Sequence, residues 1–185
     1  CGRYLTDVPN VSDGLTRQEI TLLRNYGVHL LPIYNAFRQA TGFSNGQVAA
    51  RNAAFHARRL GIPKNKILFA NIEDFFAVDA AWIRAWVETL YPTGYRPGLY
   101  ADPIKGDFAK AYCEAVQQQN KVAVQAIIWS AAPRPGTTSE QRAPKYAPAS
   151  PNCKANVWAW QYGRDAQTCP VDTNLVDRRL LDFLY

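Results

Sequence analysis

Short apolar runs alternate with amphipathic helical stretches along the whole chain, and this alternation constrains the fold more than any other feature of the sequence. In the helical stretches apolar residues recur at i, i+3, i+4 and i+7, whereas the apolar runs have the length and composition of strands. Helices and strands in this order predict an α/β fold with a parallel sheet. The predicted strands are residues 1–6, 28–34, 66–73, 95–101, 122–129, 156–162 and 171–176.

These strands are one short of the number that closes a (β/α)8 barrel. We therefore predict an incomplete or modified (β/α)8 TIM-like barrel, whose first strand would precede Cys1. The chain contains no methionine, so we expect it to be a processed piece of a longer chain. The competing architecture is an open doubly wound sheet, but no glycine-rich nucleotide motif follows any predicted strand. Without a linker or repeat, residues 1–185 are expected to form one barrel domain.

Several helix and loop signals lie between the strands. Thr16 and Glu19 form a capping box, and Ser44 with Gln47 is expected to open a second helix. Further helices are predicted from about Asp79 and over residues 107–119. The proline-rich segment 131–155 has no periodicity, which predicts a long loop that is mobile or faces a substrate.

The net charge of +6 favours an anionic partner such as nucleic acid, acidic lipid or a bacterial wall polymer. The basic residues are dispersed and do not form a stripe with aromatic residues, so we expect no nucleic-acid partner. No apolar run approaches the roughly 18 residues of a membrane-spanning helix, so we expect no transmembrane segment.

The four cysteines, Cys1, Cys113, Cys153 and Cys169, do not have the spacing of a zinc site, so no metal is expected. An even number of cysteines suggests secretion and disulfides, which allow three connectivities. We favour the pairs Cys153–Cys169 and Cys1–Cys113. The alternative is that all four are reduced thiols.

The stretch FANIEDFF, residues 69–76, ends a predicted strand on carboxylates. Side chains alternate along a strand, so Asn71 and Glu73 share a face with the apolar residues before them, and Asp74 lies on the other face. If the first face points into the barrel, Asn71 and Glu73 lie at the mouth where barrel enzymes hold their catalytic groups. The alternative is that Glu73 forms an ion pair or caps the next helix.

Polar and aromatic residues end the other predicted strands as well. Aromatic faces combined with carboxylates and amides suit a sugar, and two carboxylates beside a glycosidic bond are the usual groups for its hydrolysis. The alternative for the tryptophans is that they only fill the core. The candidate residues at these strand ends are Tyr34, Tyr100, Asp102, Trp129, Trp160, Gln161, Asp172 and Asn174.

The order of the motifs resembles the glycoside hydrolase family 25 lysozymes. It resembles more closely the bacterial glycoside-hydrolase-like domains of the domain-of-unknown-function family 1906. Each motif alone is weak, but their order along nearly the whole chain is fairly specific. The motifs are NIE at 71–73, GYRPGLY at 94–100, IWSA at 128–131, WQY at 160–162 and VDTN at 171–174, with GRYL at 2–5, LTxxE at 15–19 and LPIY at 31–34 for the second family.

The resemblance implies a secreted domain at the bacterial envelope that acts on a cell-wall glycan. Glu73 matches the proton donor of the lysozymes, and Asp172 matches the acid of their last strand. The lysozymes have Asp-x-Glu where this chain has Asn71-x-Glu73. The aspartate that ends their first strand has no counterpart here, and it either lies upstream of Cys1 or is absent.

We therefore expect acid-assisted hydrolysis of a peptidoglycan-type polymer, with Glu73 as general acid, Asp172 as second carboxylate and no cofactor. The other candidates from the strand ends, with Asn71, would contact the substrate. Two alternatives stay open. One is a catalytically inactive wall-binding module, and the other is an envelope interaction protein that uses the basic surface and segment 131–155.

Overall fold

The computed structural model describes residues 1–135, 142–164, 166 and 171–185. The strands are β1 (Gly2–Tyr4), β2 (Leu31–Tyr34), β3 (Ile67–Asn71), β4 (Arg96–Ala101), β5 (Ile127–Ser130), β6 (Arg134–Pro135), β7 (Val157–Arg164) and β8 (Thr173–Val176). The α-helices are α1 (Arg17–Asn25), α2 (Phe43–Arg59), α3 (Ala80–Leu90), α4 (Phe108–Gln118) and α5 (Lys121–Gln125), and the 3-10 helices include η1 (Tyr91–Thr93) and η3 (Arg178–Phe183).

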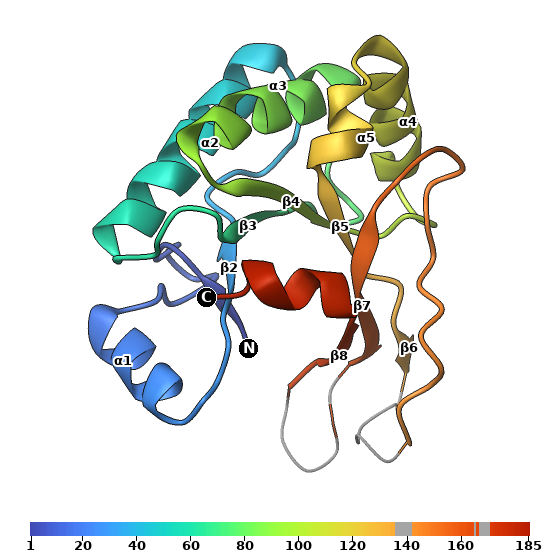
Figure 1. Ribbon diagram of the computed structural model, residues 1–185. Coiled ribbons are helices and arrows are strands. Elements are labelled where there is room, and N and C mark those ends of the chain that lie inside the picture. Colours follow the sequence, from blue (N-terminus) through green and yellow to red (C-terminus); the bar gives the residue numbers. More distant parts are fainter. Residues whose placement is uncertain (136–141, 165, 167–170) are drawn as a thin grey trace.

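The strands form one sheet in the order β1-β2-β3-β4-β5-β7-β6, with β8 added beside β7. All neighbours run parallel except β7 and β8, which are antiparallel. The sheet curls into a half-barrel, with α2 to α5 on one side and η3 on the other (Figure 1). The α/β prediction is therefore confirmed and an incomplete barrel agrees with the structure, although the described strands do not form a closed eightfold barrel.

The alternation predicted for the third strand is present in β3. Ile67 and Phe69 lie in the apolar cluster on the concave side of the sheet, together with Trp129 and the η3 residue Leu180. The intervening residues of β3 pack against the helices on the convex side. The concave face of β3 therefore leads directly to Asn71 and the residues that follow it.

Helix α2 buries a face of small residues against α3. A Cβ atom on Gly46 would lie 2.5 Å from the carbonyl oxygen of Trp82, so the two helices approach as closely as glycine allows. The apolar side chains of Val48 and Phe55 in the same helix are exposed. The buried face consists of Gly46, Ala49, Ala50, Ala53, Ala54 and Ala57.

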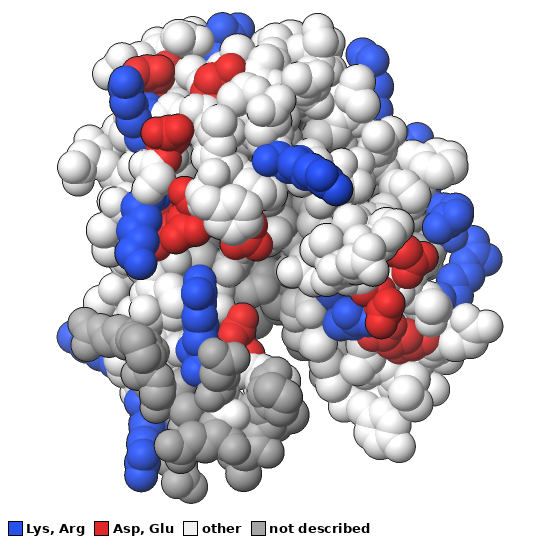
Figure 2. Space-filling view, turned by 180° about the vertical axis from the view of Figure 1, so that it is seen from behind, with Lys and Arg blue, Asp and Glu red and all other residues white. Residues whose placement is uncertain are grey.

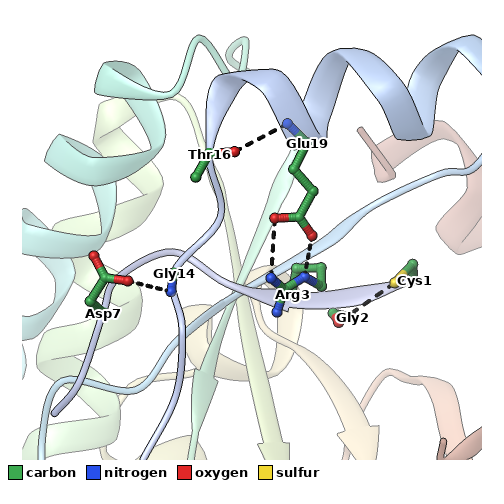
Figure 3. Close-up of polar contacts among 7 residues, drawn as sticks. All are labelled: Cys1, Gly2, Arg3, Asp7, Gly14, Thr16 and Glu19. Atoms are coloured by element: carbon green, nitrogen blue, oxygen red, sulfur yellow. Dashed lines mark hydrogen bonds and ion pairs between the residues drawn. The ribbon is translucent and has the colours of Figure 1, made fainter.

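The segment between β1 and α1 is held by side-chain contacts (Figure 3). The hydroxyl of Thr16 accepts a hydrogen bond from the Glu19 amide over 3.1 Å, as the capping signal predicts. The carboxylate of Glu19 also forms a bidentate ion pair with Arg3 of β1. This pair connects α1 to the first strand of the sheet.

Four local predictions differ from the structure. The predicted strand 122–129 begins as helix α5, whose buried Val122 packs in the helix-side core, and only its end is β5. The second helix begins at Phe43 with no side-chain cap, so Ser44 does not open it. Segment 131–155 includes the short strand β6, and residues 136–141 lie outside the described part of the chain. The last strand is antiparallel because it forms a hairpin-like pair with β7 instead of following a crossover helix.

The disulfide of the structure joins Cys113 to Cys153, with their Cα atoms 5.7 Å apart, and both predicted pairings that use these residues are wrong. The described residues that precede β7 pass beside α4 (Figure 1), which brings Cys153 to Cys113 of this helix. Cys1 is an exposed free thiol, and Cys169 lies outside the described residues. Sequence spacing could not reveal this pairing because the bond depends on how the long segment packs on the helices.

Candidate functional site

The predicted catalytic residues meet at a cavity of about 790 Å³ between the two ends of the curled sheet. Residues of β1 form one wall, residues next to and within β8 form another, and β3, β4, β5 and β7 contribute the concave side of the sheet. The full lining is Cys1, Gly2, Tyr4, Ile33, Asn71, Glu73, Tyr100, Trp129, Gln161, Arg164, Val171, Asp172 and Asn174.

Glu73 reaches this cavity from the carboxyl end of β3. The Ile72 amide still bonds to the Tyr100 carbonyl, so the chain continues the strand up to Glu73 before it turns. Asn71, two residues earlier on the same face, donates from Nδ2 to Oε1 of Glu73 over 2.9 Å. The carboxylate is thereby oriented by a neutral neighbour.

Asp172 lies at the cavity immediately before β8, with an exposed side chain. Its carbonyl oxygen accepts a hydrogen bond from Asn174 Nδ2 over 3.1 Å. The Oδ1 atom of Asn174 accepts in turn from the indole Nε1 of Trp129 over 2.9 Å. The Trp129 ring also lies close to Gly2, where a Cβ atom would come within 3.0 Å of it. Trp129 therefore bridges β1 and β8 across the interior.

Tyr100 and Gln161 form a second polar pair in the lining. The Tyr100 hydroxyl donates to Gln161 Oε1 over 2.5 Å. Burial raises the pKa of Tyr100 strongly, and the negative charge of Glu73 raises it further. Burial also raises the pKa of Tyr4, and the negative charge of Glu73 raises it further. Both phenols therefore stay protonated at physiological pH.

Three predicted contact residues do not line this cavity. Tyr34 follows the cavity residue Ile33 and so points to the convex side, where its ring stacks near His56 and Trp86. The carboxylate of Asp102 accepts the amides of Ile104 and Lys105 in the turn after β4. Trp160 lies next to Tyr146 and Tyr162.

Sequence reasoning missed Tyr4 and Arg164 as site residues. Arg164 was overlooked because the predicted strand ended at Tyr162, whereas β7 continues to Arg164. Tyr4 occurs in the GRYL motif, but only the curl of the sheet brings it near the two carboxylates, whose charges both affect it. The sequence offers no clear signal for either residue, because Gly163 directly follows the WQY run and glycine is typical of a turn.

Among the described residues, no group of three or more histidine, cysteine or acidic side chains could hold a metal ion. Within the same part of the chain, no helix is long and apolar enough to cross a membrane. The face seen in Figure 2 carries basic and acidic side chains interspersed with one another. This view agrees with the dispersed charge of the sequence.

The half-barrel with a polar cavity at its strand ends is a glycoside-hydrolase-like fold. The sequence profile of the Rv2525c-like, glycoside hydrolase-like domain family matches residues 1–176, and the chain belongs to this family. No curated protein matches the sequence. The family resemblance read from the sequence motifs is therefore confirmed.

The solved structures similar to this chain include the following two. An uncharacterized protein of B. stearothermophilus, with a crystal structure at 1.07 Å, shares 82% identity with a TM-score of 0.97, and the alignment covers 100% of this chain and 86% of that one. The catalytic domain of endolysin ply40, from bacteriophage P40 of Listeria monocytogenes, has a TM-score of 0.54 at 17% identity, with coverages of 98% and 81%. The second likeness shows a common fold.

Proposed function

We propose that this domain binds a peptidoglycan-type glycan of the bacterial cell wall and hydrolyses a glycosidic bond in it. The observation that carries the proposal is that Glu73 and Asp172, far apart in sequence, line one cavity with aromatic and amide side chains. Its volume of about 790 Å³ is within the range of small-molecule sites and has room for sugar units. The likeness to an endolysin catalytic domain supports a wall glycan as the substrate.

In this mechanism Glu73 is the general acid. Asn71 donates to Oε1, which leaves Oε2 free to carry the proton that is passed to the oxygen of the leaving sugar. Asp172 is the second carboxylate, which stabilises the positive charge that develops on the sugar ring or activates the attacking water. Trp129 offers an apolar ring in the cavity, held by its bond to Asn174.

The test is the release of reducing ends from purified peptidoglycan. The parent protein should release them, and Glu73→Gln should reduce the rate by about 100-fold or more, as expected for loss of general acid catalysis. Asp74→Asn is the matched control, because Asp74 is the adjacent carboxylate, is exposed and does not line the cavity. Equal rates for the parent and Glu73→Gln would refute the assignment of Glu73.

A second candidate is a binding module without hydrolysis. The observation in its favour is that Asn71 supplies a neutral amide where the family 25 lysozymes, which the sequence resembles, have an aspartate. This candidate predicts that the protein sediments with peptidoglycan and releases no reducing ends. Loss of sedimentation in Asp172→Ala, at an exposed residue that lines the cavity, would then assign the binding to the cavity.

We also propose that the domain works outside the cytoplasm. The Cys113–Cys153 disulfide supports this location, because disulfides persist in oxidising compartments. Labelling of intact cells with a membrane-impermeant reagent should reach the protein, and resistance to labelling in intact but not lysed cells would contradict the proposal.

A further inference from the structure

Gln161 has an amide nitrogen without a partner at the wall of the cavity. Its side chain is only 2% exposed, and Nε2 has no hydrogen-bond partner among the described residues. Its other polar atom, Oε1, is occupied by the hydroxyl of Tyr100. A buried donor without a partner is costly, so a native protein that keeps one usually binds a ligand or a water molecule with it.

Tyr100 fixes which atoms of Gln161 remain free. The two residues belong to β4 and β7, which are separated in the sheet by β5, so their hydrogen bond crosses the concave surface. Because the raised pKa of Tyr100 keeps the phenol protonated, its O–H remains a donor throughout the physiological range. With Oε1 engaged by this hydroxyl, the unpartnered groups of Gln161 are its N–H donors.

We propose that Gln161 is a specificity-determining residue that donates an N–H to a carbonyl or carboxylate oxygen on the bound sugar, and that Tyr100 is the positioning residue that holds it. This inference rests on the proposed binding of a glycan in the cavity. The Asn71–Glu73 pair supplies the acidic part of the same cavity. The site thus has separate acceptor and donor regions, which orient a sugar that carries such a substituent.

Arg164 allows a carboxylate oxygen on the sugar to be distinguished from a neutral acyl carbonyl oxygen. It is exposed, lines the same cavity and has no acidic partner among the described residues. Its charge acts on Tyr100, opposing the effect of Glu73. A carboxylate on the sugar would interact with Arg164 as well as Gln161, whereas a neutral acyl carbonyl would depend on Gln161 alone.

The decisive variant is Gln161→Glu. Glutamate has the same shape and can still accept the hydrogen bond of Tyr100, but it offers an acceptor where glutamine offers a donor. Tyr100→Phe removes the positioning bond and leaves Gln161 in place. Gln18→Glu, on the exposed face of α1, makes the same change of charge away from the cavity. Melting temperatures of all variants identify any loss of fold.

Binding is measured by calorimetry with three probes of equal length. They are peptide-free peptidoglycan strands with free carboxylates, the same strands with the carboxylates amidated, and a β-1,4-glucan without either substituent. Gln161→Glu should weaken binding of the first probe about tenfold or more, because a site with buried donors discriminates strongly against an unsatisfied ligand. Tyr100→Phe should weaken it less, Gln18→Glu should not change it, and binding of the glucan should respond to none of the three.

The affinity for the amidated strands shows which oxygen of the sugar accepts the hydrogen bond of Gln161. Unchanged affinity for amidated strands assigns an acyl carbonyl. A loss on amidation that Arg164→Gln reproduces assigns a carboxylate. The inference is overturned if Gln161→Glu binds the first probe as the parent does, if it weakens the glucan equally, or if the parent binds no probe. If Gln161→Glu weakens binding although the parent releases no reducing ends, hydrolysis fails and this inference stands.

Discussion

Asn71 and Glu73 are joined by a hydrogen bond of 2.9 Å from the amide Nδ2 to the carboxylate Oε1. Both side chains lie on the concave face because they are two residues apart at the end of an extended strand. The bond orients the carboxylate through a neutral group. The family 25 lysozymes, which the sequence resembles, have an aspartate at the position of Asn71, so the site differs from theirs at this position.

The first prediction concerns Asn71→Asp. Two carboxylates at hydrogen-bond distance cannot both be ionised without a large penalty, so they should share a proton. Because Glu73 acts as the general acid, the alkaline limb of the pH–rate profile, where this group loses its proton, should move to higher pH by about one unit or more. Asn71→Leu, which removes the donor without adding charge, should lower the rate without this shift. The same shift should be visible in the carboxyl NMR titration of labelled protein, and an unchanged titration would count against a shared proton.

The second prediction concerns the disulfide. Its cysteines are 40 residues apart, and closing a loop of that length stabilises the folded state by about 4 kcal/mol in the chain-entropy model. Cys153→Ser should lower the free energy of unfolding by about 2–5 kcal/mol in denaturant titrations. Cys1→Ser, at the exposed free thiol, should have little effect. Equal stability of the parent and Cys153→Ser without reductant would show that the bond does not form.

Gly46→Ala tests the close approach of α2 to α3. Alanine favours a helix, but its Cβ would lie 2.5 Å from the Trp82 carbonyl oxygen, so the helices must separate. The overpacking should outweigh the gain in helix propensity and destabilise the protein by about 1–3 kcal/mol. Val48→Ala, at an exposed site on the same helix, is the control and should change stability little. If Gly46→Ala is more stable than the parent, α2 and α3 can separate at little cost in free energy.

His56 should make stability depend on pH in the acid range. Burial lowers the pKa of His56, and the nearby charge of Arg59 lowers it further. The unfolded chain therefore binds the proton more readily than the folded protein. The contribution of His56 to the stability of the folded protein is present above about pH 6.5, the pKa of a free histidine. It is lost as the pH falls below this value.

Denaturant titrations between about pH 5 and 8 measure this effect, because this range brackets the pKa of a free histidine. His56→Gln should reduce the slope of stability against pH, whereas His29→Gln, at an exposed histidine, should retain it. Parallel curves for the parent and His56→Gln would contradict the assignment.

Much of the convex side could be predicted from local pattern. The helix from Asp79 buries Ile83, Trp86, Val87 and Leu90 as its periodicity indicates, and Asp79 caps it by accepting the amide of Trp82. One cavity is lined by seven of the candidate residues: Asn71, Glu73, Tyr100, Trp129, Gln161, Asp172 and Asn174. The first five lie there as expected for strands of a curled parallel sheet, whereas Asp172 and Asn174 come from the antiparallel β8 and the residues next to it. Trp160 lies outside this cavity because it directly precedes the cavity residue Gln161 in β7, and successive side chains of a strand point to opposite faces.

Sequence alone therefore determined the α/β class, most of the strands and helices, the family and the alternating faces of β3, because these depend on local periodicity and short motifs. Tertiary structure decided the antiparallel β8, the Cys113–Cys153 bond, the hydrogen bond from Tyr100 to Gln161 and the approach of Tyr4 and Arg164 to the cavity. These features depend on how far the sheet curls and on where the long segment before β7 packs. Such contacts between distant parts of the chain leave no periodic signal in the sequence.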